Sequence, residues 1–372
     1  MRREDGFSLA LSTEKALSSV MYALVKTKPA PGAEIKTVAR PEVGEHDVLV
    51  EIRAATVCGT DVHIWEWNQW AQNRIKPSLI MGHELCGEVV EAGEKVTRVK
   101  VGDLISAETH IVDNTCYQCL TGRKHVCNNV KVLGVDRDGA FADYIVIPEE
   151  NAWINDAGLD PFVASIQEPL GNAVHAALPA NNIEDIAGGY AIVLGCGPIG
   201  LMAVAVLKEL GASKVIATEV KPLRLEFAKV MGADLTLNPQ EEKDIVGKVL
   251  DYTDGRGVDV VLEMSGAPSA LIQGLEMATN GGRVSLLGLP DNPVSIDLPR
   301  LVIFKGLRIF GITGRRMYET WYQVRELLSN TDFGAKMGRL ITHRLPMKDI
   351  AEGMDLINSG KAIKVGLYPQ WE

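Results

Sequence analysis

The pattern of apolar and polar residues differs between successive parts of the chain. From residue 21 to about residue 170, short runs of alternating or β-branched residues are separated by Gly and Pro. Alternation with a period of two predicts strands with one buried face, and the Gly and Pro residues predict turns between them. Runs of this kind occupy residues 47–52, 86–91, 103–106 and 142–147. We therefore expect a β-rich, loop-rich unit over residues 21–172.

Near Gly171 the pattern becomes one of buried strands that alternate with helices. Residues 190–194 form a continuous apolar run, which is typical of a parallel strand buried on both faces. Helical spacing follows at residues 201–210, 223–232, 245–253 and 267–278, and strand patterns at residues 214–218, 235–237, 258–263, 282–287 and 307–311. This alternation predicts a doubly wound α/β sheet over residues 173–312.

The two ends of the chain are interpreted separately. From about Gly314 the pattern returns to helices and a final strand at residues 364–368. This tail is too short to fold alone, so we expect residues 313–372 to rejoin the β-rich unit. Residues 1–20 are polar and carry both charges, without the apolar core of a secretion signal. We interpret them as an N-terminal extension.

Composition narrows the class of protein. No apolar run approaches the ~18 residues of a membrane span, so we expect no membrane partner. The net charge of −10 argues against a nucleic-acid partner, which usually requires a basic face. The six Cys in 372 residues include three that cluster, which indicates metal binding in a reducing compartment more than a disulfide framework.

A glycine motif lies where the first buried strand meets a helix. The motif is Gly195-x-Gly197-x-x-Gly200, whose glycines permit a tight turn, close approach of a pyrophosphate and close packing of the helix. Glu219 ends the second strand, 19 residues after Gly200, where a carboxylate accepts hydrogen bonds from ribose hydroxyls. The motif therefore predicts NAD in preference to NADP, although Arg224 on the next helix partly offsets repulsion of a 2′-phosphate.

A second set of residues has the chemistry of a catalytic zinc site. Cys58 follows an alternating strand pattern, and we expect it where this strand gives way to a loop. Downstream, His83 and Glu84 supply an imidazole and a carboxylate. A thiolate, an imidazole and a carboxylate are zinc ligands that leave a fourth position for water or substrate.

A cysteine lobe provides a third candidate site. Asp113, Cys116, Cys119 and Cys127 have the spacing of a small closed metal site. Asp113 stands where a fourth Cys is expected, and a carboxylate oxygen binds zinc more weakly than a thiolate. The lobe is therefore expected to hold structural zinc with one oxygen and three sulfur ligands, to bind it weakly, or to be empty in some preparations.

Together these motifs resemble the zinc-dependent medium-chain alcohol dehydrogenase family, from Met21 to the C-terminus. The supporting stretches are CGTDVH, MGHE, the cysteine lobe, EPLGNAVHAAL and GCGPIG. The resemblance implies a GroES-like β-rich catalytic domain and a doubly wound Rossmann domain that binds NAD. It also implies one catalytic zinc, bound by Cys58, His83 and Glu84, and a cytoplasmic homotetramer.

The resemblance also assigns roles to further residues. Thr60 and His63 match the family's proton relay. Glu168, in an expected turn, lies beside the metal and either coordinates zinc, tunes the relay or holds a substrate ammonium. The matching cofactor-contact positions, besides the glycines, are Ile199, Glu219, Arg224, Leu287, Gly288, Leu289, Ile312 and Thr313. His110 is interpreted either as lining the substrate pocket or as an ordinary loop histidine.

Other stretches narrow the expected substrate. HIWEWNQWAQNRIKP, SAETHIV, LGLPDNPVSID and GITGRRMYETWY are similar to members that oxidise the 3-hydroxyl of L-threonine to 2-amino-3-oxobutanoate. The alternative within the family is a polyol or diol dehydrogenase acting on sorbitol or 2,3-butanediol. A cofactor-binding relative without catalysis is disfavoured, because the metal and relay residues are all present. The Trp65, Trp67 and Trp70 stretch is interpreted as an aromatic loop that packs or covers the substrate.

Overall fold

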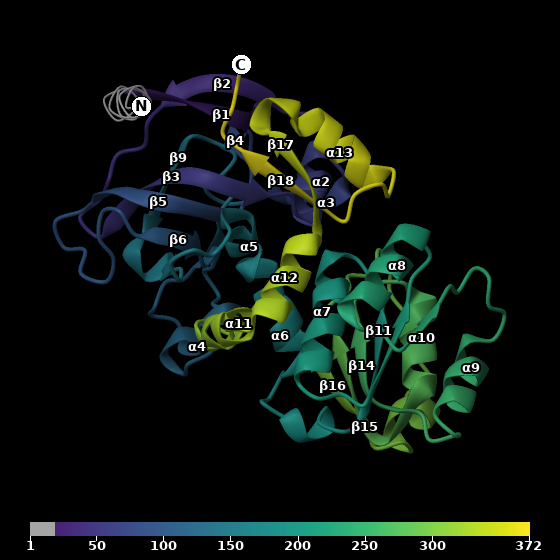
Figure 1. Ribbon diagram of the computed structural model, residues 1–372. Helices are drawn as coiled ribbons and strands as arrows, with labels where there is room; N and C mark the ends of the chain where they lie inside the picture. The colour runs from purple at the N-terminus through teal and green to yellow at the C-terminus, as the bar shows by residue number, and fades with distance from the viewer. Residues whose placement is uncertain (1–18) are drawn as a thin grey trace, which may run out of the picture.

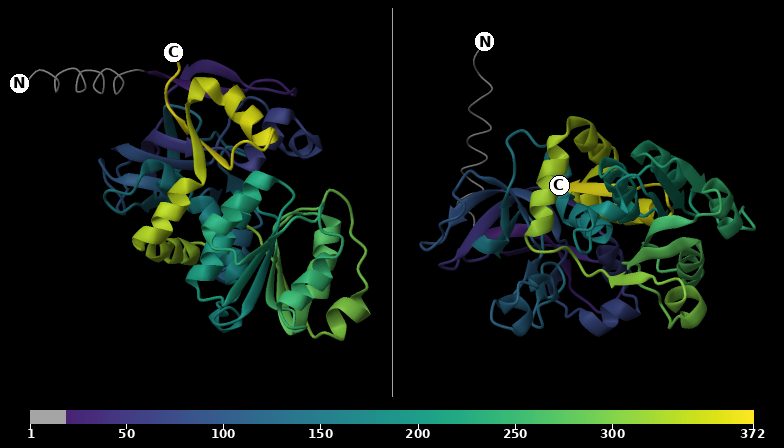
Figure 2. Two further views of the ribbon diagram at one scale, coloured as in Figure 1. Left: turned by 45° about the vertical axis from the view of Figure 1, so that its right-hand side comes forward. Right: turned by 90° about the horizontal axis from the view of Figure 1, so that it is seen from below.

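The computed structural model describes residues 19–372, so the predicted extension over residues 1–20 lies almost wholly outside the described residues. The described chain forms a β-rich part and a parallel-sheet part that lie side by side (Figure 1). Two further views show the same division, with the C-terminal segment returning to the β-rich part (Figure 2).

The β-rich part is built around a seven-stranded sheet. Its main path has the strand order β10-β6-β5-β3-β18-β17, and β9 also pairs with β3. A three-stranded sheet has the order β2-β1-β4, and β7 pairs with β8. The strands are β1 (Val20–Lys26), β2 (Glu34–Ala39), β3 (Asp47–Thr56), β4 (Leu79–Ile80), β5 (Glu84–Ala92), β6 (Leu104–Ala107), β7 (His110–Ile111), β8 (Lys131–Val132), β9 (Tyr144–Pro148) and β10 (Ala152–Ile154). The helices are α2 (Gly59–Glu66), α3 (Gln69–Arg74), α4 (Tyr117–Leu120), α5 (Pro161–Ser165) and α6 (Gln167–Ala177).

The second part contains a six-stranded parallel sheet in the order β13-β12-β11-β14-β15-β16. Its strands are β11 (Tyr190–Leu194), β12 (Lys214–Thr218), β13 (Leu235–Leu237), β14 (Val258–Glu263), β15 (Ala278–Leu286) and β16 (Arg308–Gly311). Its helices are α7 (Pro198–Glu209), α8 (Pro222–Met231), α9 (Ile245–Tyr252) and α10 (Pro268–Met277). The strand order reverses between β11 and β14, and in doubly wound sheets ligands bind at the carboxyl ends of strands beside such a reversal.

Both faces of this sheet are covered, as the apolar run at residues 190–194 predicts. Ala191 and Val193 pack in one core with residues of α7. Ile192 and Leu194 point the other way and pack with residues of α9 and α10. Successive residues of a strand face opposite sides, so an entirely apolar strand satisfies both cores.

The C-terminal segment connects the two parts. After β16 it forms α11 (Glu319–Ser329), α12 (Thr331–Arg339), β17 (Ile341–Pro346), α13 (Ile350–Asn358) and β18 (Lys364–Tyr368). β18 pairs antiparallel with β3, and Gly366 lies opposite Thr56. The last strand therefore belongs to the seven-stranded sheet and brings C-terminal side chains next to the metal-binding motif.

Cys58 lies, as expected, in the short irregular connection that follows β3; this connection leads directly into α2, which the Asp61 carboxylate caps by accepting the Cys58 backbone N–H at 2.9 Å. The structure corrects two local predictions. The expected turn at Glu168 is the first turn of α6. The expected aromatic loop is mostly helical, with Trp65 in α2 and Trp70 in α3. β17 was not predicted, because its sequence mixes apolar, basic and hydroxyl residues without alternation.

Candidate active site and metal centres

Cys58, His83 and Glu84 come together through strand pairing. Thr56 at the end of β3 lies opposite Glu84 at the start of β5. Cys58 is two residues beyond Thr56, and His83 directly precedes Glu84, so the antiparallel pair places the three side chains at one end of the sheet. One ligand atom from each side chain lies within 4.8 Å of the other two.

The surroundings of His83 suit a cation. The buried Asp61 carboxylate lies 3.7 Å from His83 Nδ1 and also accepts the Gly82 backbone N–H at 3.2 Å. Burial alone lowers the pKa of His83, but Asp61 and Cys58 outweigh burial and raise this pKa to about 10. His83 Nδ1 is buried without a hydrogen-bond partner in the described chain. A buried, unpartnered nitrogen beside a thiol and carboxylates fits a zinc ligand.

Glu84 has a partner that the motif does not reveal. Lys364 Nζ lies 2.6 Å from Glu84 Oε1 and 2.5 Å from Oε2, and the Thr56 hydroxyl donates to Oε2. The Lys364 side chain is 2 % exposed and that of Glu84 is 0 % exposed. Glu84 is therefore shared between a buried cation of the chain and the predicted metal position.

Glu168 lies in the first turn of α6 and is also buried. Burial by itself raises its pKa, but the Arg315 guanidinium, which donates to Glu168 Oε1, and the smaller effects of His83, His110 and Lys364 together outweigh burial and lower the pKa. His83 acts on Glu168 in the same direction, and Glu168 raises the pKa of Glu84, so the three groups share one electrostatic site. The structure thus places Glu168, in its ionised form, beside the candidate metal ligands Cys58, His83 and Glu84.

The predicted relay residues lie on α2, one turn apart. Thr60 is half-buried, and its Oγ1 lies 3.9 Å from Cys58 Sγ. His63 is exposed, and its Nδ1 lies 2.9 Å from Asn68 Nδ2. Because an amide nitrogen only donates, His63 Nδ1 accepts this bond and Nε2 carries the proton of the neutral ring. The pair therefore leads from the thiol towards solvent.

His110 lies close to Glu168 and His83, whose charges act on it. Burial lowers its pKa to about 4, and the Arg315 charge acts in the same direction. Its Nδ1 is buried and without a hydrogen-bond partner among the described residues. A Cβ added to Gly314 would lie 2.6 Å from His110 Cε1, so the edge of the His110 ring packs directly against the Gly314 backbone. His110 is thus a neutral, tightly packed ring and not an ordinary loop histidine.

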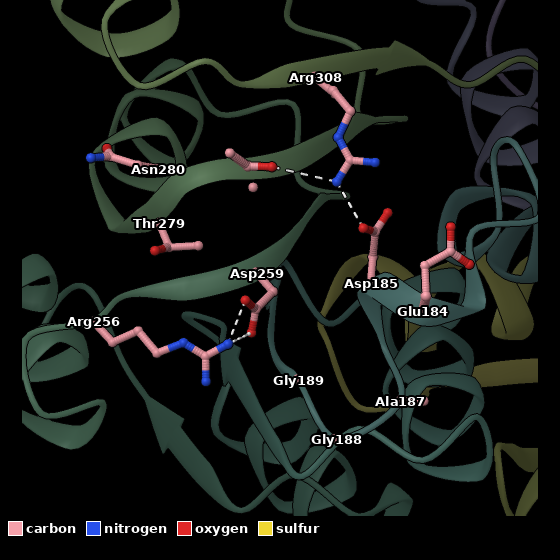
Figure 3. A pocket seen from close by; sticks show the side chains of 12 residues that line it. Glu184, Asp185, Ala187, Gly188, Gly189, Arg256, Asp259, Thr279, Asn280 and Arg308 are labelled. Atoms are coloured by element: carbon pink, nitrogen blue, oxygen red, sulfur yellow. Dashed lines mark hydrogen bonds and ion pairs between the residues drawn. The ribbon is translucent and has the colours of Figure 1, made fainter.

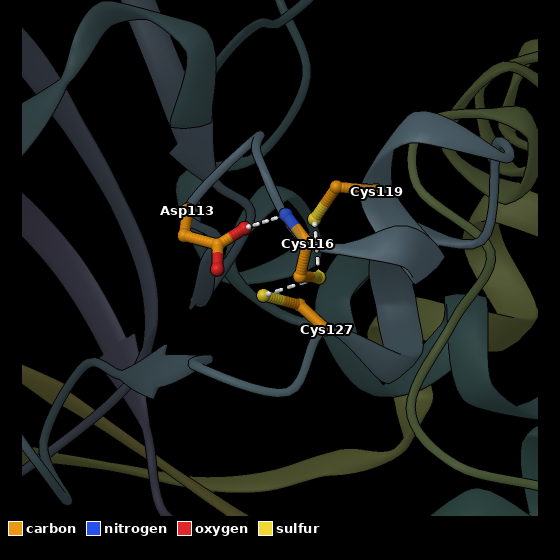
Figure 4. Close-up of side chains that lie close together, drawn as sticks. All are labelled: Asp113, Cys116, Cys119 and Cys127. Atoms are coloured by element: carbon orange, nitrogen blue, oxygen red, sulfur yellow. Dashed lines mark hydrogen bonds between the residues drawn. The ribbon is translucent and has the colours of Figure 1, made fainter.

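The four lobe residues also converge. The ligand atoms of Asp113, Cys116, Cys119 and Cys127 all lie within 4.8 Å of one another, and the side chains point towards a common centre (Figure 4). Cys116 Sγ is 3.5 Å from Cys119 Sγ and 3.7 Å from Cys127 Sγ. Asp113 is turned into the cluster by backbone N–H donors at Thr115 and Cys116. Three sulfur atoms and one carboxylate in this arrangement fit a tetrahedral zinc ion.

The predicted cofactor residues gather at the carboxyl ends of the parallel strands. Gly195 follows β11, has a φ of +93°, and contacts Ser265 closely enough that a Cβ would lie 2.7 Å from it. A Cβ on Gly200 would lie 2.0 Å from the Gly195 carbonyl oxygen, so the helix packs directly on the turn. A Cβ on Gly197 would meet no atom within 4 Å, which leaves open space above the start of α7. This cradle fits a pyrophosphate.

The remaining predicted cofactor-contact residues also lie at or after the carboxyl ends of the parallel strands. Glu219 directly follows β12, and its carboxylate accepts the backbone N–H groups of Cys196, Val220 and Lys221. Arg224 Nη1 lies 3.7 Å from Glu219 Oε2. The other predicted positions are Ile199 in α7, Leu287, Gly288 and Leu289 after β15, and Ile312 and Thr313 after β16.

A polar hollow of about 270 Å³ lies at the opposite edge of this sheet. Arg308 pairs there with Asp185 at 2.7 Å, and Arg256 pairs with Asp259 at 2.5 Å (Figure 3). Its lining lies at the amino ends of β11, β14, β15 and β16, away from the glycine cradle. The hollow contains no predicted site residue and is not where a doubly wound sheet binds its cofactor.

A sulfur–nitrogen–oxygen cluster beside a parallel sheet with a glycine cradle defines a metal- and dinucleotide-dependent oxidoreductase. Residues 44–155 match the alcohol dehydrogenase GroES-like domain, and residues 198–330 match the zinc-binding dehydrogenase family. The chain belongs to the zinc-binding dehydrogenases.

Named relatives and one solved structure agree with this membership. The L-threonine 3-dehydrogenase of Bacillus subtilis is 51 % identical over 352 residues, which cover 95 % of this chain and 99 % of that protein. The L-threonine 3-dehydrogenase of Pyrococcus abyssi is 50 % identical over 350 residues, which cover 94 % and 99 %. The crystal structure of an alcohol dehydrogenase from Thermotoga maritima has a TM-score of 0.87 and 30 % identity, covering 95 % of this chain and all of that one.

Two important side chains were missed by sequence reasoning. Lys364 and Arg315 are both buried beside predicted site carboxylates. A signal for Lys364 exists, because a lone Lys interrupts the apolar stretch from Ala362 to Leu367. A buried Lys or Arg is almost always paired, so an apolar strand that contains one indicates a buried acid elsewhere.

Proposed function

We propose that the chain catalyses the NAD-dependent oxidation of the 3-hydroxyl of L-threonine to 2-amino-3-oxobutanoate. The observation that carries the proposal is the convergence of Cys58, His83 and Glu84 in a chain whose parallel sheet also presents a glycine cradle at its carboxyl edge. The sequence identity of 50–51 % to L-threonine 3-dehydrogenases, over 94–95 % of this chain, supports the choice of substrate.

The chain's own residues supply binding and proton transfer. A zinc ion held by Cys58, His83 and Glu84 supplies Lewis acidity, which lowers the pKa of an alcohol. Thr60 borders the thiol and relays the proton of the substrate hydroxyl, giving up its own hydroxyl proton as it accepts the new one, and the exposed His63 exchanges the released proton with solvent. The ionised carboxylate of Glu168 suits the ammonium of an amino-acid substrate.

The cofactor is bound at the strand ends. The turn at Gly195, Gly197 and Gly200 presents backbone N–H groups and the start of α7 to the pyrophosphate. Glu219 is held at the end of β12 by three backbone N–H groups, in position for the adenosine ribose hydroxyls. A fixed negative charge there favours NAD over NADP.

The proposal also covers the domain boundaries, the oligomeric state and the cellular location of the enzyme. The catalytic domain comprises residues 21–172 and 313–372, and the NAD-binding domain comprises residues 173–312. The enzyme acts as a cytoplasmic homotetramer, in keeping with the exposed apolar residues Ile303, Phe304 and Ile309 at and before the edge strand β16. In residues 19–372, no helix is both long enough and apolar enough to cross a membrane.

A substrate panel on metal-analysed protein tests the proposal. L-Threonine, sorbitol and 2,3-butanediol are compared by kcat/KM with NAD, because polyol and diol oxidation are the alternatives within the family. We expect the largest kcat/KM for L-threonine. A clear preference for either polyol rejects the proposed substrate, and NADH binding without turnover of any of the three rejects the enzyme assignment.

A further inference from the structure

The segment between β16 and α11 crosses from the cofactor sheet to the catalytic part and is anchored on both sides of Arg315. His175 in α6 donates from Nδ1 to the Gly314 carbonyl oxygen at 2.8 Å. Met317 packs against the apolar side of the cysteine lobe, with Cys119 and Cys127. The backbone that carries Arg315 is therefore held between α6 and the lobe.

The Arg315 side chain is 1 % exposed, and each of its N–H groups has an acceptor. Nε donates to Glu108 Oε2 at 2.8 Å, and Nη2 donates to Glu108 Oε1 and, at 2.8 Å, to Thr109 Oγ1. Nη1 donates to Glu168 Oε1 and, at 3.4 Å, to Asn172 Oδ1. A guanidinium has five N–H donors in a rigid plane, so these five contacts determine its orientation completely.

Glu108 is the fixed end of this arrangement. It is fully buried, and besides both arms of Arg315 it accepts the Trp321 indole N–H at 2.8 Å and the His110 backbone N–H at 2.9 Å. This bidentate pair neutralises Arg315 and orients it. The Nη1 edge that remains is directed at Glu168.

Glu168 is held through only one of its two oxygens. The hydrogen bonds that reach its side chain, from Arg315 Nη1 and from Thr109 Oγ1 at 3.4 Å, both end on Oε1 within residues 19–372. Oε2 is left for another partner. Glu168 also interacts electrostatically with His83 and Glu84, so its carboxylate lies at the border of the candidate metal site.

We propose that Arg315 is the positioning residue for Glu168: it fixes Oε1 and thereby presents Oε2 to the ammonium of the amino-acid substrate. This inference rests on the proposed function, because only a substrate with an ammonium group uses the presented oxygen. Lys at position 315 keeps the charge but lacks the planar fork, so it cannot hold Glu108 and Glu168 at the same time.

The test is a double-mutant cycle with two substrates. Variants Arg315→Lys, Glu168→Gln and the double variant are assayed with L-threonine and with 3-hydroxybutanoate, which has the same carbon skeleton without the amino group. Arg316→Lys is the matched control, because its neighbouring guanidinium contacts Asn181 and Glu319 away from the metal cluster. Zinc content, NADH binding by fluorescence and thermal unfolding are measured for every variant.

We expect Arg315→Lys to lower kcat/KM for L-threonine by about 100-fold, the scale of a misplaced positioning group. It should change kcat/KM for 3-hydroxybutanoate by less than about threefold and leave zinc content and NADH binding intact. The double variant should be no slower with L-threonine than Glu168→Gln, because Arg315 acts through Glu168. Arg316→Lys should behave like the wild type.

Three results overturn the inference. These are losses that multiply in the double variant, an equal loss on both substrates, or a loss of zinc or NADH binding in Arg315→Lys. A wild-type enzyme that fails on L-threonine but oxidises a polyol refutes the proposed function instead, so the two failures are distinguishable.

Discussion

Replacing Lys364 by Met removes one partner of the buried pair with Glu84 and leaves the carboxylate uncompensated in metal-free protein. At an effective dielectric constant of about 20, the Coulomb attraction across the 2.6 Å contact is about 6 kcal/mol. Removing one partner of a buried ion pair usually costs about 3–5 kcal/mol, because the stranded charge loses water as well as its partner. Met has nearly the length of the Lys stem, so the packing change is small.

Protonation limits this cost and makes it depend on pH. The stranded Glu84 can take up a proton, and relative to its ordinary pKa of 4.5 this costs about 3.4 kcal/mol at pH 7 and about 0.7 kcal/mol at pH 5. The destabilisation by Lys364→Met is therefore about 3 kcal/mol at pH 7 and below about 1 kcal/mol at pH 5. For a domain of this size, the larger value lowers Tm by about 6–12 °C.

The assay is calorimetry of chelator-treated wild type and variant at pH 7 and pH 5, at one scan rate. Lys26→Met is the matched control. Lys26 is equally buried, but its ammonium contacts the carbonyl oxygens of Ala30, Gly32 and Trp65 and, among residues 19–372, no carboxylate. Its loss strands no acid, so its penalty should be the same at both pH values. A penalty for Lys364→Met that does not shrink at pH 5 would refute this reasoning.

Three further changes have definite expected outcomes. Asp113→Cys should slow zinc release from the lobe to a chromogenic chelator at least tenfold, because thiolate binds zinc more tightly than carboxylate; an unchanged rate contradicts Asp113 as a ligand. Burial lowers the pKa of His175 to about 4, although the hydrogen bond to the Gly314 carbonyl raises it. Because the unfolded chain takes up the proton first, stability falls as pH drops from 6.5 towards 4. His175→Asn keeps the donor and should recover about 2 kcal/mol of that fall at pH 5, measured as the difference in unfolding free energy from pH 7; an unaltered pH dependence contradicts the assignment. Glu219→Ala should reduce the ratio of kcat/KM with NAD to that with NADP by about 10–100-fold, and an unchanged ratio excludes a ribose contact.

The fold could be predicted where local pattern and tertiary burial agree. The strand Tyr190–Leu194 is apolar on both faces because it lies between two helical layers, so its sequence contains the information that the structure uses. The helix after Cys58 could not be predicted in this way. Its residues include β-branched Val62 and Ile64, and it begins because the Asp61 side chain caps it.

The candidate site could be predicted for residues with recognisable spacing and not for their partners. Cys58 and His83 lie in motifs, and the pairing of β3 with β5 explains why two motifs 25 residues apart meet. Lys364 and Arg315 lie far from those motifs in the sequence, and only the return of the C-terminal segment brings them in. Such contacts depend on topology, which residue spacing alone does not encode.

The buried charges explain why these partners are needed and why they are not sufficient. Asp61, Glu84, Glu108 and Glu168 are four buried carboxylates around one centre, and Lys364 and Arg315 supply two positive charges. His83 is neutral when it binds a metal, so two negative charges then remain before Cys58 is deprotonated, and uncompensated buried charges cost several kcal/mol each. A divalent ion beside Cys58 and His83 offsets this excess, whereas a third buried Lys or Arg would offset only half of it. With the ion bound and Cys58 ionised, one negative charge remains, which makes the site a poor place for a substrate carboxylate but a good one for an ammonium, the end of the substrate that we assign to Glu168.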